Sequence, residues 1–230
     1  MVTIGNFDGV HQGHQAVLAE ARKQADRLKL PLVAVTFEPH PRAVLRPKEA
    51  PVRLTHIKEK AALLAHYGVD AVYVLRFTKA FAKTTPEDFV RGILLHGLHA
   101  RAVIVGEDFS FGRDRAAGIA ALRAMGAEEG YTVTTLTPVK VAGEVCSSTR
   151  IRTALAAGDV ATAQTLLGRP LALTPRERPQ WLKVLKNGEY QVEIAYTDEH
   201  TTGTVNVHDG QLTWTSAHPK GVRLLVICGV

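Results

Sequence analysis

Residues 5 to 14 read Gly5-Asn6-Phe7-Asp8-Gly9-Val10-His11-Gln12-Gly13-His14, and they join a short β-branched run to a segment with helical periodicity. Gly5 and Gly9 let the backbone turn sharply and come close to a ligand. In an open α/β sheet such a strand-to-helix turn lies at the carboxyl edge of the strands, where ligands bind. The segment therefore predicts an α/β fold and the place of its site.

The same alternation of strand-like and helical segments continues to about Leu167. The expected strands are β-branched runs at Val2 to Ile4, Leu32 to Phe37, Ala71 to Leu75, Ala102 to Val105 and Tyr131 to Leu136. The expected helices lie between them at Gln15 to Leu28, Ile57 to His66, Glu87 to Leu95 and Ile119 to Glu129. This rhythm predicts a Rossmann-like parallel sheet of about five strands with crossover helices.

The sequence changes character after Gly168-Arg169-Pro170. Strand-like runs follow, separated by two hairpin signals, Lys186-Asn187-Gly188 and His208-Asp209-Gly210. We therefore predict an α/β domain at residues 1–170 and a small β-rich domain at residues 171–230. Two short helices, Ser147 to Ala156 and Asp159 to Leu167, are expected at the end of the first domain.

The composition is that of an ordinary globular protein: 230 residues, 46% hydrophobic, with 28 Lys and Arg against 22 Asp and Glu. It excludes a disordered or fibrous chain. Two distant cysteines argue against a disulfide scaffold or a cysteine zinc site. The sparse cysteines favour a reducing cytoplasm, and no apolar run approaches the roughly 20 residues needed to cross a bilayer, so we expect no membrane partner. The net charge of +6 suits nucleic acid or small anionic substrates, and the scattered basic residues make nucleic acid the less favoured partner.

The two histidines of the turn are three residues apart, so a helical first turn brings their rings to one side. A helix N-terminus also offers free N–H groups and a positive dipole to phosphate oxygens. His11 and His14 are therefore interpreted as a phosphate clamp. The alternatives are structural histidines or a metal bound by His-x-x-His. The P-loop and Gly-x-Gly-x-x-Gly patterns are absent, which indicates a different kind of nucleotide site.

Three further segments carry candidate chemistry. In Thr36 to Pro41 two prolines stiffen the loop after a strand, either as part of the site or as a plain surface turn. In Val105 to Gly112, Phe109 and Phe111 alternate, so that one ring is free to face a planar ligand, unless both lie in the core. Ser147 to Arg152 offers hydroxyls and arginines for a second anion, or helix caps with solvated arginines.

In sequence order, these four segments resemble the motifs of HxGH nucleotidyltransferases, in the version found in the FAD synthetase half of bacterial bifunctional riboflavin kinase/FAD synthetases. The resemblance covers roughly residues 1 to 170. It implies that AMP passes from ATP to FMN, giving FAD and pyrophosphate, by direct attack of the FMN phosphate on the α-phosphorus. Mg²⁺ is expected to be carried on ATP, and no protein ligand to a metal is assigned.

The resemblance also implies three groups of site residues. Alignment and charge stabilisation are expected from the catalytic candidates His11, His14, Ser148, Thr149 and Arg152. ATP binding is expected from these five together with Gly5, Asn6, Phe7 and Asp8. Flavin binding is expected from Pro39, Pro41, Arg42, Asp108, Phe109 and Phe111.

Two parts of the chain depart from the family pattern. Leu171 to Val230 has no Pro-Thr-Ala-Asn segment, so we predict no riboflavin kinase activity and interpret this part as a shortened or degenerate barrel. Arg115-Ala116-Ala117 replaces the usual Arg-x-Gly arrangement in the flavin-side loop. Two other functions stay open: a related nucleotidyltransferase with another phosphorylated substrate, and a non-catalytic flavin- or nucleotide-binding protein. No pattern in the sequence sets the oligomeric state.

Overall fold

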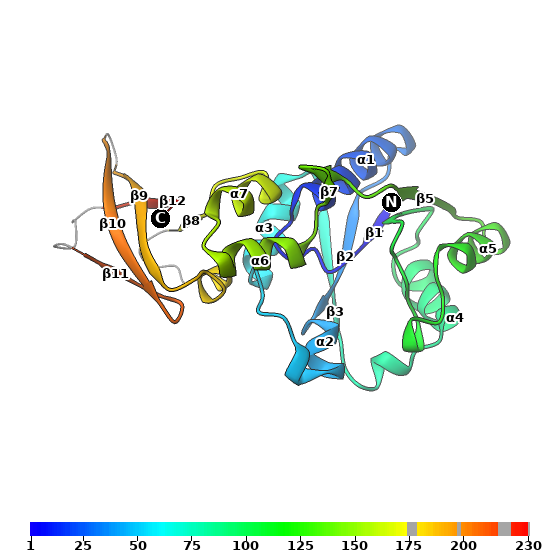
Figure 1. Ribbon diagram of the computed structural model, residues 1–230. Coiled ribbons are helices and arrows are strands. Elements are labelled where there is room, and N and C mark those ends of the chain that lie inside the picture. The colour runs from blue at the N-terminus through cyan, green and yellow to red at the C-terminus, as the bar shows by residue number, and fades with distance from the viewer. Residues whose placement is uncertain (174–178, 197–198, 216–221, 230) are drawn as a thin grey trace. The chain divides into compact units, whose positions relative to one another are not determined.

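A computed structural model describes residues 1–173, 179–196, 199–215 and 222–229 (Figure 1). The chain divides into two compact units. The first unit comprises residues 1–51 and 57–139, and the second comprises residues 52–56 and 140–230.

The first unit is built on a five-stranded parallel sheet with the order β3-β2-β1-β4-β5. Its strands are β1 (Val2–Ile4), β2 (Val33–Glu38), β3 (Ala71–Arg76), β4 (Ala102–Gly106) and β5 (Thr132–Leu136). Every neighbouring pair is parallel. This confirms the predicted Rossmann-like sheet, and each strand lies within two residues of its expected bounds.

Helices cover both faces of this sheet. They are α1 (Gln12–Leu28), the short α2 (Pro41–Leu45), α3 (Ile57–His66), α4 (Pro86–Asp88), which continues into the π-helix η3 (Phe89–Gly97), and α5 (Ile119–Glu129). Short 3-10 turns complete the unit: η1 (Pro47–Glu49), η2 (Phe81–Lys83) and η4 (Arg113–Arg115).

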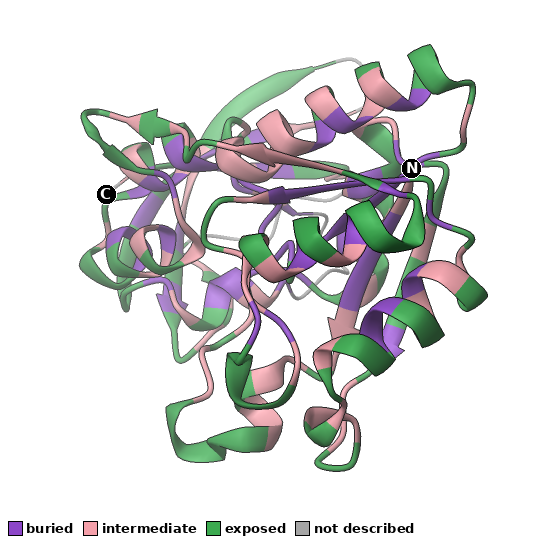
Figure 2. Cartoon of the chain, turned by 90° about the vertical axis from the view of Figure 1, so that its right-hand side faces the viewer, coloured by how far each residue is buried: buried purple, intermediate pink, exposed green. Residues whose placement is uncertain are grey.

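The two faces carry separate cores because successive strand residues point to opposite sides. On one face, Ala34 packs with Leu18 of α1 and Leu64 of α3. On the other, Val35 packs with Leu94 of η3 and Leu122 of α5. Figure 2 shows buried residues along the strands and on the inner sides of helices, with exposed residues on the outer sides. The sheet is therefore covered by helices on both faces.

The helix starts follow their capping residues. The Asp88 N–H donates to the Thr85 hydroxyl at 3.1 Å, and Pro86 takes the first helical position, as predicted. The first helix begins at Gln12, three residues earlier than predicted, because His11 serves as its N-cap. His14 is therefore the third residue of α1.

The second unit combines two helices with an antiparallel sheet of order β11-β10-β9-β12-β8. Its elements are β6 (Lys140–Val141), β7 (Glu144–Val145), α6 (Ser148–Ala157), α7 (Val160–Leu167), β8 (Ala172–Leu173), the 3-10 helix η5 (Gln180–Lys183), β9 (Gly188–Ala195), β10 (His200–His208), β11 (Gln211–Trp214) and β12 (Leu224–Gly229). Leu155 and Leu166 of the two helices share a core with Tyr190 and Ile227 of the sheet. Packing thus groups α6 and α7 with the strands that follow them. The predicted boundary after Pro170 had grouped these two helices with the α/β domain instead.

The two predicted hairpins had different outcomes. His208-Asp209-Gly210 does join β10 to β11, with Asp209 and Gly210 at φ of 48° and 73°. The prediction at Lys186-Asn187-Gly188 is wrong, because a 3-10 helix rather than a strand precedes it. Instead, the Asn187 side chain accepts the Asp209 N–H at 2.9 Å and donates to its carboxylate at 3.2 Å. Asn187 thereby braces the β10–β11 turn.

Within the described ranges, no helix has both the length and the apolar character that crossing a membrane requires.

Candidate functional site

The carboxyl ends of β2, β1 and β4 lie side by side at one edge of the first unit's sheet. The chain leaves β1 toward β2 on one side and returns later to β4 on the other, so a topological switch point lies here. Three of the four predicted segments leave these strands: residues 5–14 after β1, residues 36–41 at the end of β2, and residues 105–112 at the end of β4. The sheet order therefore brings these three segments to one edge.

The turn after β1 is held in an unusual backbone conformation. Phe7 and Val10 adopt φ of 47° and 40°, a left-handed region that costs a residue other than glycine about 1–3 kcal/mol. Both side chains are buried in the core on the α1 face. The Val10 N–H donates to the Phe7 carbonyl at 3.2 Å, and the Gln15 side chain donates to the Val10 carbonyl at 2.8 Å. Packing and hydrogen bonds thus hold the strained turn in place.

The two histidine rings of this turn lie against each other. Their centroids are 3.7 Å apart and their planes differ by 20°. The Nδ1 atom of His11 accepts the His14 N–H at 3.4 Å, which caps α1. The rings of Phe7 and His14 meet edge to face, with their centroids 5.2 Å apart. His11 is 6% exposed and His14 is half-buried, so the pair is fixed by its neighbours.

His14 resists protonation in this setting. Burial lowers its pKa well below the usual 6.5, and the charges of His11 and Lys60 lower it further. Its Nδ1 is buried and has no hydrogen-bond partner among the residues that the structure describes. Near neutral pH, His14 is therefore an uncharged N–H donor, and the expected clamp is not a pair of fixed cations.

Lys60 and Thr36 also lie at this turn, and neither was among the individual site residues predicted above. Lys60 lies on α3, is 1% exposed, and donates from Nζ to the Thr36 hydroxyl at 3.4 Å. That hydroxyl donates to the Asn6 carbonyl at 3.2 Å. Lys60 occupies the stripe of α3 that holds Ile57 and Leu64, and a lysine on an apolar stripe was the available signal.

The segment after β2 forms more than the stiff turn that its prolines suggested. The peptide bond between Glu38 and Pro39 is cis, and Pro41 opens the short helix α2. The ring nitrogen Nδ1 of His40 caps this helix by accepting the Arg42 N–H at 3.2 Å. Pro39 and Arg42 are exposed and Pro41 is half-buried, so two of the three expected flavin contacts lie at the surface.

The aromatic residues after β4 lie in a loop, because the strand ends at Gly106. Phe111 is buried against Phe89, with centroids 5.7 Å apart, and Phe109 stacks on it at 5.6 Å. Phe109 is half-buried, and the expected flavin contact Asp108 is exposed. Phe111 therefore packs inward and leaves Phe109 as the more accessible ring. The roles of these residues toward a flavin stay predictions.

Gly112 ends this loop at a position that excludes a side chain. Its φ is 75°, and a Cβ there would lie 2.6 Å from Cγ of Pro86. We expect Gly112→Ala to lower the free energy of unfolding by about 1–3 kcal/mol, measured by urea denaturation. Gly92→Ala is the matched control, because a Cβ there meets nothing within 4 Å. Equal stability of the two variants would contradict this reading of the loop.

The fourth predicted segment lies in the second unit, which holds Ser148, Thr149 and Arg152 in the first half of α6. The Ser147 hydroxyl caps the helix by accepting the Arg150 N–H at 3.2 Å. The Arg150 guanidinium donates to backbone carbonyls of the β6–β7 hairpin and pairs with Glu144 at 3.1 Å. Arg152 Nε donates to the Val52 carbonyl at 2.6 Å. Arg150 thus has a structural role. Ser148 and Thr149 are the first two residues of α6, directly after the capping residue Ser147.

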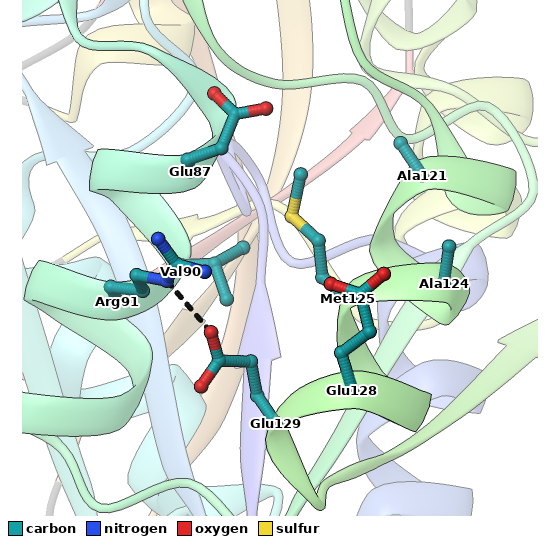
Figure 3. Close-up of a pocket in the computed structure, with 8 residues that line it drawn as sticks. All are labelled: Glu87, Val90, Arg91, Ala121, Ala124, Met125, Glu128 and Glu129. Carbon is teal, nitrogen blue, oxygen red and sulfur yellow. Dashed lines mark hydrogen bonds and ion pairs between the residues drawn. The ribbon is translucent and has the colours of Figure 1, made fainter.

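A cavity of about 280 Å³ lies between the α4–η3 segment and α5 (Figure 3). Its lining residues are Glu87, Val90, Arg91, Ala121, Ala124, Met125, Glu128 and Glu129. Arg91 is paired with Glu129 at 2.7 Å, which leaves two carboxylates on the rim. None of the predicted site residues lines it, and its acidic rim repels a triphosphate. We therefore place the candidate site at the β1–α1 turn.

No group of three or more histidine, cysteine or acidic side chains suited to a metal ion occurs in the described part of the chain.

Comparison with known proteins agrees with the motifs. The family model for FAD synthetase matches residues 1–150. A bifunctional riboflavin kinase/FMN adenylyltransferase of Pseudomonas fluorescens is 43% identical over 176 residues, which cover 76% of this chain and 56% of that protein. The protein with the same name in Escherichia coli K12 is 39% identical with the same coverage. The chain thus spans little more than half the length of these relatives.

A solved structure described as a macrolide-efflux protein from Streptococcus pneumoniae aligns with a TM-score of 0.79. The alignment covers all of this chain and 83% of that one, at 24% identity, and it shows a shared fold alone. From the match to the family model over residues 1–150, the chain belongs to the FAD synthetase family.

Proposed function

We propose that this protein transfers AMP from ATP to FMN and releases FAD and pyrophosphate. The observation that carries the proposal is the stacked pair His11 and His14 at the N-terminus of α1, at the switch point of the sheet. The family match and the names of the relatives support the choice of substrates.

The reaction needs no nucleophile from the protein. An oxygen of the FMN phosphate forms a bond to the α-phosphorus of ATP, and the bond from that phosphorus to the bridging oxygen of the β-phosphate breaks. Pyrophosphate leaves with the electron pair. Because the FMN phosphate is ionised near neutral pH, no general base is needed, and alignment alone supplies about 7–11 kcal/mol in favourable cases. ATP enters as its magnesium complex, and Mg²⁺ keeps most of its water shell.

The proposed roles follow from the chemistry of each group. The backbone N–H groups of the α1 first turn and the rings of His11 and His14 donate to phosphate oxygens where charge develops. For Ser148, Thr149 and Arg152 of α6, a role in ATP binding is proposed on the family resemblance alone. Gly5, Asn6, Phe7 and Asp8 form the wall of the ATP site.

The flavin side is proposed to be the loops that follow β2 and β4. Pro39, Pro41 and Arg42 come from the first loop, and Asp108, Phe109 and Phe111 come from the second. Both strands flank β1, so the two loops border the turn that holds ATP.

Chromatography of flavins tests the whole assignment in one assay. The protein is incubated with ATP and Mg²⁺ and with FMN or riboflavin, and the products are separated. We expect FAD from FMN and no FMN from riboflavin, because residues 171–230 lack the Pro-Thr-Ala-Asn segment. If no FAD forms from FMN but another phosphorylated compound is adenylylated, FMN is not the acceptor. Formation of FMN from riboflavin would contradict the absence of kinase activity.

A further inference from the structure

Lys60 is a buried cation in the first unit. Its side chain extends from α3 into the α1-side face of the sheet and is 1% exposed. Burying an ammonium group is costly, so a buried lysine is rare unless other groups compensate for its charge. Its hydrogen bond connects it, through Thr36, to the β1–α1 turn.

The hydrogen bonds around Lys60 lead to that turn. A lysine ammonium only donates, so the 3.4 Å contact makes the Thr36 hydroxyl oxygen the acceptor. The Thr36 proton is then directed to the Asn6 carbonyl at 3.2 Å. This relay fixes the peptide between Asn6 and Phe7, where the backbone turns into its left-handed conformation. Lys60 thus stabilises the geometry of the β1–α1 turn through Thr36.

The charge of Lys60 also reaches the histidine pair. It is one of the groups that lower the pKa of His14, after burial and His11. An uncharged His14 offers a hydrogen bond but little net charge to a triphosphate. A fixed ammonium in low-dielectric surroundings attracts phosphate more strongly than a solvated lysine does.

We propose that Lys60 is a phosphate-positioning residue, which holds the Gly5–His14 turn through Thr36 and supplies the fixed positive charge next to the imidazole pair. This inference deepens the proposed adenylyl transfer and rests on it for the identity of the ligand. It adds a residue of α3 to the segments that leave β1, β2 and β4 at this edge of the sheet.

The test compares Lys60→Met, which keeps the length of the chain but removes the charge, with Lys60→Arg, which keeps the charge. Lys58→Met is the matched control, since Lys58 is exposed on the same helix. Binding of ATP and of inorganic tripolyphosphate is measured by calorimetry without FMN. We expect Kd to rise at least tenfold in Lys60→Met, to be largely restored in Lys60→Arg, and to change less than twofold in Lys58→Met.

A second readout separates positioning from a general structural role. The titration of His14 is followed by NMR in the protein without ligand. Lys60→Met is expected to move the pKa of His14 up toward its usual value, whereas Lys58→Met leaves it in place. An unchanged titration, or unchanged affinity for both phosphates in Lys60→Met, would overturn the proposal. If Lys60→Met does not fold, Lys60→Gln takes its place with the same readouts.

The outcomes also separate this inference from the proposed function. If the wild-type protein makes FAD but Lys60→Met binds ATP normally, only the role of Lys60 fails. If no FAD forms but ATP binding still depends on Lys60, only the acceptor assignment fails. If the wild-type protein binds neither ATP nor tripolyphosphate, both proposals fail.

Discussion

His14→Ala is expected to lower the turnover of FMN to FAD by more than tenfold while the protein stays folded. The His14 ring lies at the third position of α1, stacked on His11 and in contact with Phe7. Removing a donor aimed at developing charge costs catalysis about 10²–10³-fold in well-studied sites, so tenfold is a modest lower bound. Steady-state kcat and KM for FMN and ATP are the measurement.

A surface histidine provides the control for this change. His66 is exposed at the end of α3, and His66→Ala is expected to keep wild-type turnover. Thermal unfolding of both variants establishes that they are folded. Wild-type turnover in His14→Ala would remove the histidine pair from the catalytic machinery.

ATP affinity is expected to rise as the pH falls, by at most about tenfold per pH unit, over the range that lies between the pKa of His14 in the complex and its lower pKa in the free protein. Without ligand, the pKa of His14 lies well below 6.5, chiefly because of burial and then because of His11 and Lys60. Phosphate oxygens beside the ring favour its protonated form and raise that pKa. Between the two pKa values, binding therefore takes up a proton.

The same shift gives a sign for stability. Well above pH 6.5, His14 is neutral in both the folded and the unfolded state, and its titration has no effect on folding. Below that value the unfolded chain takes up the proton first, so the free energy of unfolding decreases as the pH decreases.

The proton uptake that accompanies ATP binding is measured by calorimetry in buffers of different ionisation enthalpy. His14→Asn is the control, and an equal uptake in that variant would assign the proton to ATP or to another group.

The fold of the first unit was predictable because its signals are local. β-branched runs and helical periodicity placed all five strands, and Thr85-Pro86 marked a helix start that the structure confirms. Three of the four motif segments then lie at one edge of the sheet, because they follow neighbouring parallel strands. These features need only short-range sequence patterns and a standard topology.

Other features depend on tertiary contacts that no local pattern encodes. Lys60 lies on the apolar stripe of α3, which indicates burial, but only the packing of that helix brings it next to Thr36. Asn187-Gly188 has the composition of a hairpin turn, but the segment before it forms a 3-10 helix. Ser147 to Arg152 follows the motifs of the first unit in sequence, yet its helix packs with the antiparallel sheet. In each case a distant partner decides the outcome.

The cap of α1 has a chemical consequence for His11. Because its Nδ1 atom accepts the His14 N–H, the neutral ring must carry its hydrogen on Nε2, so the cap selects the tautomer. The one N–H donor of the neutral His11 ring therefore lies at Nε2. A second proton on Nδ1 would turn the acceptor into a donor and break the cap. The contact that orders the first helical turn therefore also sets which nitrogen of His11 carries the hydrogen.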